Sequence, residues 1–98
     1  MRKSYIMVFS SSFADRKQVT DYLDEIGPDW DWQAEFPNCV FFTSELSAWE
    51  LAKMFENKFG IDMGKMFVIA PVIGSESQGR LTERAWRLLN DPRNPRGR

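Results

Sequence analysis

Residues 4–10 would carry apolar side chains on both faces of an extended strand, and this feature restricts the fold more than any other. The two sets are Tyr5, Met7 and Phe9 on one side and Ile6 and Val8 on the other. Residues 66–72 show the same pattern near the other end of the chain. A strand of this kind lies in the middle of a sheet or has its second face covered by another element. The sequence therefore predicts a sheet that needs cover on both faces.

Two helices are predicted between these strands. Apolar residues at helical spacing from Val19 to Ile26 predict the first helix, which Gly27 and the proline after it would end. Ser12 and Asp15 have the spacing of a capping box at its start. A second capping box, Ser47 with Glu50, predicts a helix that runs to Gly60.

A hairpin is predicted between the two helices. Residues 30–36 alternate strictly, and residues 39–43 return as the second strand after a Pro-Asn turn. The side chains expected on one face of the first hairpin strand are Trp30, Trp32, Ala34 and Phe36. A short last helix is predicted to start near Thr82.

This order of elements predicts an α+β, ferredoxin-like βαββαβ antiparallel sheet with two helices on one face, plus the short C-terminal helix. We expect residues 1–90 to form a single domain. Residues 91–98 hold two prolines and a glycine and are expected to form a flexible basic tail.

Two helices cover only one face of a four-stranded sheet, and the second face is predicted to be apolar. Three covers are possible: the third helix with Trp86, a second copy of the protein, or stacked nucleic-acid bases. Strand parity alone leaves open which set of residues 4–10 faces away from the helices. We expect a homodimer, with Tyr5, Met7 and Phe9 as the dimer face.

Composition removes several classes of site. The 98 residues include no histidine and one cysteine, Cys39. Histidine-based metal sites, His-assisted nucleophiles and internal disulfides are therefore excluded. We expect no cofactor, and Mg²⁺ or Mn²⁺ only if the protein is a nuclease. A cytoplasmic protein without a membrane partner is expected.

Charge is unevenly distributed although the net charge is only −1. Residues 15–35 hold seven acidic and two basic side chains, whereas residues 80–98 hold two acidic and six basic ones. The six basic residues are Arg80, Arg84, Arg87, Arg93, Arg96 and Arg98. They could follow nucleic-acid phosphates, pair with the acidic region of a neighbouring subunit or form a solvated helix face.

Three acids are weak candidates for a metal site. Asp29 and Asp31 lie on the same edge of the predicted strand 30–36, and Asp15 is the first acid after strand 4–10. Paired carboxylates can hold Mg²⁺ or Mn²⁺. Charged residues on an edge strand also protect against aggregation, which is an alternative role for the Asp29 and Asp31 pair.

Three segments carry a resemblance to a known group of proteins: the strand Ser-Tyr-Ile-Met-Val-Phe-Ser-Ser at 4–11, the Trp-containing hairpin, and Gly-Arg-Leu-Thr-Glu-Arg-Ala-Trp at 79–86. With these, the chain resembles the small ferredoxin-like proteins related to the CRISPR adaptation nuclease and to virulence-associated protein D toxins. The resemblance implies a homodimer and nucleic acid as substrate or scaffold. The nucleases of that group place a metal-binding aspartate just after the first strand, where this chain has Ser10, Ser11 and Ser12.

We therefore expect a homodimeric binding or interaction module without catalysis of its own. The resemblance links such a module to toxin–antitoxin or phage-defence systems and to nucleic acid. One alternative is a metal-dependent nuclease of the same group. Another is a regulator that docks on a protein partner through its acidic first helix.

Overall fold

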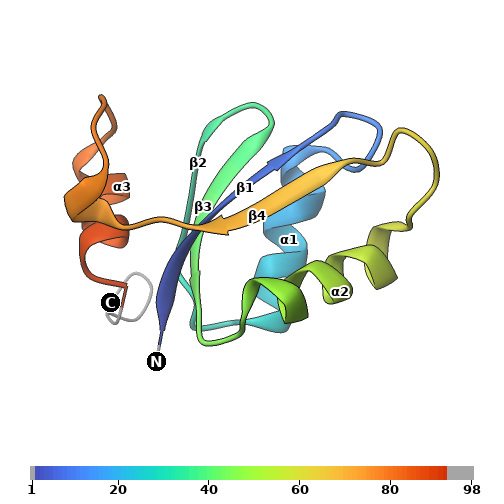
Figure 1. Ribbon diagram of the computed structural model, residues 1–98, viewed down its shortest axis with the longest axis horizontal. Coiled ribbons are helices and arrows are strands. Elements are labelled where there is room, and N and C mark those ends of the chain that lie inside the picture. The colour runs from blue at the N-terminus through green and yellow to red at the C-terminus, as the bar shows by residue number, and fades with distance from the viewer. Residues whose placement is uncertain (1, 93–98) are drawn as a thin grey trace.

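The computed structural model describes residues 2–92 and contains four strands and three α-helices (Figure 1). The elements in chain order are β1 (Lys3–Phe9), α1 (Arg16–Ile26), β2 (Trp32–Phe36), β3 (Cys39–Ser44), α2 (Ala48–Phe59), β4 (Phe67–Pro71), the 3₁₀ turn η1 (Gly74–Glu76) and α3 (Glu83–Asn90). The fold class is α+β, as the sequence predicts.

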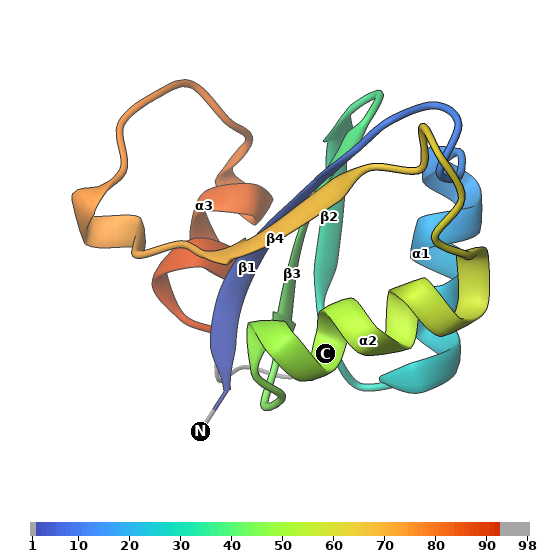
Figure 2. The same ribbon diagram turned by 45° about the vertical axis from the view of Figure 1, so that its right-hand side comes forward.

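The strands form one antiparallel sheet in the order β2-β3-β1-β4. Strand β1 lies in the interior and pairs with β3 on one side and β4 on the other. This position explains why both of its faces are apolar. Helices α1 and α2 lie on one side of the sheet and α3 on the other (Figure 2).

The main core fills the space between the sheet and the first two helices. Tyr5, Met7 and Phe9 of β1 are buried there against Leu23 of α1 and Phe55 of α2. The Tyr5 ring stacks on Phe42 of β3 with 5.6 Å between the ring centroids. Each such side chain contributes about 1.5–3 kcal/mol by leaving water, so this layer supplies most of the hydrophobic stabilisation.

A second, smaller core lies beneath α3. Leu88 and Leu89 of this helix pack on Phe41 of β3, with Ile6 and Trp86 partly buried at the margin. The third helix is thus one of the covers of the second sheet face, as its apolar side predicts.

Polar contacts fix α3 to the sheet at both of its ends. The Ser4 hydroxyl donates a hydrogen bond to the Leu88 carbonyl at 2.9 Å, near the end of the helix. Thr82 is the N-cap residue, and its hydroxyl and main-chain N–H both donate to the carboxylate of Glu35 in β2. An acidic group at a helix N-terminus also interacts favourably with the helix dipole.

The start of α1 differs from the sequence prediction. The capping box joins Asp15 to Gln18, not Ser12 to Asp15, so the helix begins at Arg16. The preceding turn places Phe13 in the core, 4.8 Å from the Phe67 ring centroid. Because the turn is needed to bury this large ring, the helix begins later in the chain than the predicted capping box implies. The box of Ser47 and Glu50 at the start of α2 is confirmed.

The described residues 2–92 include no helix whose length and hydrophobicity would allow it to span a membrane.

Gly27 ends α1 at a point where the chain has no room for a side chain. A Cβ atom there would lie 2.0 Å from the Trp30 ring. We expect Gly27→Ala to lower the free energy of unfolding by about 1–3 kcal/mol because the buried indole must move. Urea denaturation measures this loss, and Ser11→Ala at an exposed turn position is the control. Equal stability of the two variants would contradict the predicted steric conflict.

Candidate interaction surface

Four side chains form a row across the second face of the sheet, one from each strand. Phe36 of β2 pairs with Cys39 of β3, Cys39 with Val8 of β1, and Val8 with Val68 of β4. Directly paired residues of antiparallel strands project to the same face, so these side chains are neighbours. Phe36 and Val8 are each 44% exposed and Val68 is 57% exposed. We call these four residues the apolar row.

Phe36 belongs to this face because β2 is irregular. Its register with β3 shifts between Gln33 and Phe36, as in a β-bulge. One extra residue in a strand reverses the faces of all residues beyond it. The prediction that Phe36 shares a face with Trp32 and Ala34 is therefore wrong. Its ring instead meets Phe41 edge-on, with 6.3 Å between centroids, beside the second core.

The apolar surface extends past Val68 at the β4 edge of the sheet. Met66 precedes β4 on the same face and is 67% exposed. With Val8 and Val68 it lines a shallow hollow of about 380 Å³. Exposure of apolar side chains on this face is therefore greatest beside β4.

At the other end of the row, a cavity of about 300 Å³ separates the sheet from the segment that leads into α3. Phe36, Phe41, Leu81 and Trp86 give it an apolar lining, and Arg80 lies at its margin. This cavity continues the apolar row under the edge of α3 and adds one cationic group to it.

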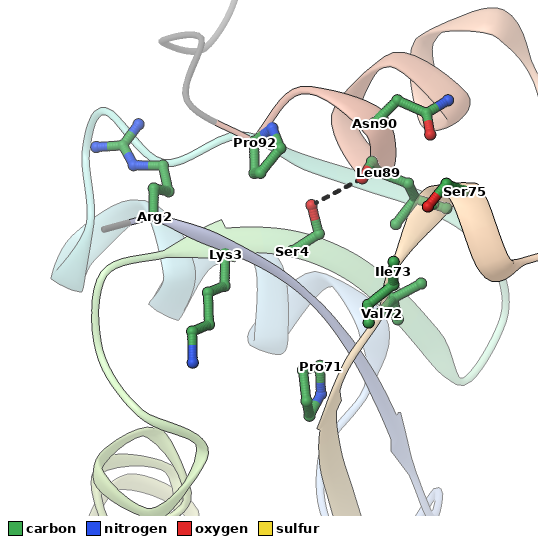
Figure 3. Close-up of a pocket in the computed structure, with 11 residues that line it drawn as sticks. Arg2, Lys3, Ser4, Pro71, Val72, Ile73, Ser75, Leu89, Asn90 and Pro92 are labelled. Atoms are coloured by element: carbon green, nitrogen blue, oxygen red, sulfur yellow. Dashed lines mark hydrogen bonds between the residues drawn. The ribbon is translucent and has the colours of Figure 1, made fainter.

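A larger cavity of about 520 Å³ lies where β1 and β4 meet the end of α3 (Figure 3). Ser4 lines it, and its hydroxyl is already used by α3: besides the bond to Leu88 it lies 3.4 Å from the Leu89 carbonyl. Val72 and Ile73 supply apolar walls. The Ser4 contact thus attaches the end of α3 to β1.

Tyr5, Met7 and Phe9 do not form an outer face. All three are buried beneath α1 and α2, so they cannot contact a second copy. Pleat parity puts Ile6 and Val8 on the second face instead. The expected dimer face is corrected accordingly.

The structure does not bring the three candidate metal ligands together. Asp15 caps α1 by accepting from the Gln18 N–H at 2.8 Å. Asp29 forms an ion pair with Arg2 at 3.2 Å, and the Asp31 main chain hydrogen-bonds to Thr43. Among residues 2–92, no group of three His, Cys, Asp or Glu side chains is placed to hold a metal ion. This arrangement lends no support to the nuclease alternative.

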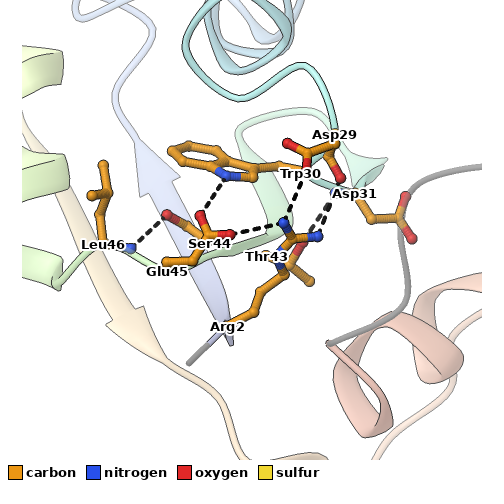
Figure 4. A network of polar contacts seen from close by, with 8 residues as sticks. All are labelled: Arg2, Asp29, Trp30, Asp31, Thr43, Ser44, Glu45 and Leu46. Carbon is orange, nitrogen blue, oxygen red and sulfur yellow. Dashed lines mark hydrogen bonds and ion pairs between the residues drawn. The ribbon is translucent and has the colours of Figure 1, made fainter.

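Asp29 belongs to a polar network around Arg2 (Figure 4). Arg2 Nη2 donates to Glu45 Oε2 at 2.8 Å, and the indole N–H of Trp30 donates to Glu45 Oε1 at 3.1 Å. The hydrogen bond from Arg2 is the main cause that holds the pKa of Glu45 below its ordinary value. The network ties the first strand to the loop before β2 and to the end of β3, so its role is structural.

In the described part of the arginine cluster, Arg84 and Arg87 belong to α3 and Arg80 lies in the segment before it. Arg80, Arg84 and Arg87 are exposed, and no acid between residues 2 and 92 forms an ion pair with them. We call these three residues the arginine ridge. Arg93, Arg96 and Arg98 lie outside the described residues.

The acids of α1 make different contacts, and Asp21 and Glu25 line the same hollow. Asp21 pairs with Lys17 at 3.0 Å within the helix, and Asp24 accepts a hydrogen bond from the Trp32 indole at 2.8 Å. Glu25 remains exposed. Docking of a protein through this helix stays a prediction.

Comparison of the chain with protein-family models, curated proteins and solved structures finds no match. The candidate surface is therefore identified from the structure alone. Sequence reasoning found Ile6 and Val8 as possible second-face residues but missed Phe36, Val68 and Met66. The unbroken apolar run of residues 66–72 was a signal for the last two, whereas the β-bulge left no signal in the sequence.

Glu45 gives a pH test of the network. Because its folded-state pKa is lowered, its stabilising effect is present above the unfolded pKa of about 4.3 and is lost as pH falls through the folded value. We expect Glu45→Gln to be less stable than the wild type at pH 7 and the difference to shrink below about pH 4. Urea denaturation across this range measures it. In an Arg2→Met background the same substitution should show little of this pH dependence, and an unchanged dependence would contradict the role of Arg2.

Proposed function

We propose that this protein is a non-catalytic interaction module that associates as a homodimer through the apolar row and the adjacent Met66. The observation that carries the proposal is the alignment of Phe36, Val8 and Val68, which are exposed, with the partly buried Cys39 across the four strands on the second face. A monomer seldom exposes so continuous an apolar surface unless it serves as a contact site.

The strand order supports a ferredoxin-like arrangement as the framework of this module. Two βαβ units, each with a strand of the other between its own strands, would account for the order β2-β3-β1-β4. Such a framework leaves one sheet face free for partners. Here α3 covers part of this face, over β1, β2 and β3, and the part beside β4 stays open.

The chemistry of the surface agrees with binding better than with catalysis. Burial raises the pKa of the Cys39 thiol, so the sulfur is a poor nucleophile at neutral pH. Arg80, which lines the cavity at the Phe36 end of the row, has no carboxylate partner among residues 2–92. The surface is therefore mainly apolar, which suits contact with another apolar surface.

Val68→Lys tests the proposal. A lysine at this exposed position of an edge strand puts a charge into the contact, and we expect dimerisation to weaken about tenfold or more. Light scattering coupled to size exclusion, over a wide range of concentration, measures the mass against the 11.5 kDa chain. Ile73→Lys, which changes an apolar residue of similar exposure (58%) outside the row, is the matched control. A wild-type chain that is monomeric throughout would refute the homodimer.

The arginine ridge favours nucleic acid as a second candidate partner. Three exposed guanidinium groups on and just before α3 can each contact a phosphate and release counterions. We expect weak binding of single-stranded RNA or duplex DNA. The logarithm of the binding constant should fall linearly with the logarithm of the salt concentration, with a slope of about −2 to −3.

The control for this second candidate is a second triple variant that removes the same number of positive charges. Arg80, Arg84 and Arg87 changed together to Gln should flatten the salt slope, whereas Lys3, Lys53 and Lys58 changed together to Gln should not. These lysines are exposed on other elements. Equal effects of the two triple variants would show that only net charge matters and that the ridge is not a site.

A further inference from the structure

The two edge strands of the sheet differ in whether their outward main-chain groups have hydrogen-bond partners. At the β2 edge, Arg16 of α1 donates to the carbonyls of Ala34 at 3.2 Å and Phe36 at 3.3 Å. The bulge in the same strand adds a further obstacle to strand addition. Both features are typical of a protected edge.

The β4 edge has no such protection. Val72 N–H donates to the Ser4 carbonyl and Ser10 N–H to the Met66 carbonyl, each at 2.9 Å. Because an antiparallel ladder alternates, the main-chain groups of even-numbered residues in β4 face β1. Those of Phe67 and Ile69 therefore point outward, where no strand of residues 2–92 pairs with them.

Apart from Pro71 at its end, the residues of β4 present no barrier to pairing. The strand is Phe-Val-Ile-Ala-Pro and contains no charged residue. Lys65, the nearest charge before it, is held by the Phe59 carbonyl at 2.7 Å. An uncharged edge beside the most exposed end of the apolar row is an open template for another strand.

We propose that the β4 strands of two copies pair antiparallel about a two-fold axis at Val68, joining the two sheets into one. This inference rests on the proposed homodimer and specifies how it forms. In this register the N–H and C=O of Phe67 bond to those of Ile69 of the partner subunit, and the reverse pair is equivalent. The outward N–H and C=O groups of Phe67 and Ile69 in each copy are then all used.

The two-fold position at Val68 follows from Pro71 and from the apolar row. An axis at Ile69 would pair Phe67 with Pro71 of the partner subunit, and proline lacks the required N–H. An axis at Val68 avoids this loss and sets the side chains of Val68 from the two copies against each other. The two apolar rows then continue into one strip across the joined sheet.

The pattern fits a second copy better than an unrelated strand. The outward groups form a self-complementary set about Val68, as an isologous two-fold interface requires. Pairing also brings the two Val68 side chains together and places Met66 beside Ala70 of the partner subunit, at the end of the row where apolar exposure is greatest.

Two substitutions at one position test the edge. Ile69→Pro removes the outward N–H without removing a bond to β1, while Ile69→Ala loses the side chain but keeps the N–H. We expect the proline variant to be monomeric and the alanine variant to retain dimers in light scattering. Circular dichroism checks that both variants remain folded.

Cross-linking gives an independent reading that needs no destabilising change. In a Cys39→Ser background, Val68→Cys places two thiols opposite each other across the axis, and a mild thiol oxidant should give a covalent dimer. Ile73→Cys in the same background is the control and should give little. Dimers that persist in Ile69→Pro, or a Val68→Cys variant that cross-links no better than the control, would overturn the edge pairing while leaving the homodimer standing. A monomeric wild type would refute both.

Discussion

The interior position of β1 is the constraint on which the rest of the structure depends. A strand hydrogen-bonded on both edges and apolar on both faces requires cover on both sides of the sheet. Helices α1 and α2 supply one layer over Tyr5, Met7 and Phe9. The second layer is α3, which begins 12 residues after β4 ends and packs on Phe41. The last described helix thus covers part of the second face that the apolar first strand requires to be buried.

Polar contacts decide how far this second layer reaches. Glu35 holds the N-cap of α3 over β2, and Ser4 holds the carbonyls at its other end over β1. A helix of eight residues spans about 12 Å, so attachment at these two points leaves the opposite half of the face uncovered. The apolar row is therefore a geometric consequence of where α3 is fastened. Its exposure follows from the length of the helix and the position of its two anchors.

Local patterns predicted the elements but not the faces that they present. The apolar alternation of β1, the capping box of Ser47 and Glu50, and the N-cap Thr82 are all short-range signals, and each is found in the structure. Phe36 changed face because a bulge adds one residue to a ladder whose partner strand decides the register. The contact of Glu35 with Thr82 joins positions 47 residues apart, which no local pattern encodes. Sequence reasoning predicted an apolar second face that could include Ile6 and Val8, but the extent of this surface depends on both of these features.

The polar contacts of the acid-rich first half of the chain lie near the β2 edge of the sheet and not near the β4 edge. Carboxylates of this region are used singly, by Arg2, Lys17, the Trp32 indole and the α3 cap, so they stabilise the α1 and β2 side of the sheet. Arg16 from the same helix closes the β2 edge. Strand β4 has α2 beneath it and no charged side chain of its own. Polar protection is thus concentrated at β2, whereas the open edge and the exposed end of the apolar row coincide at β4.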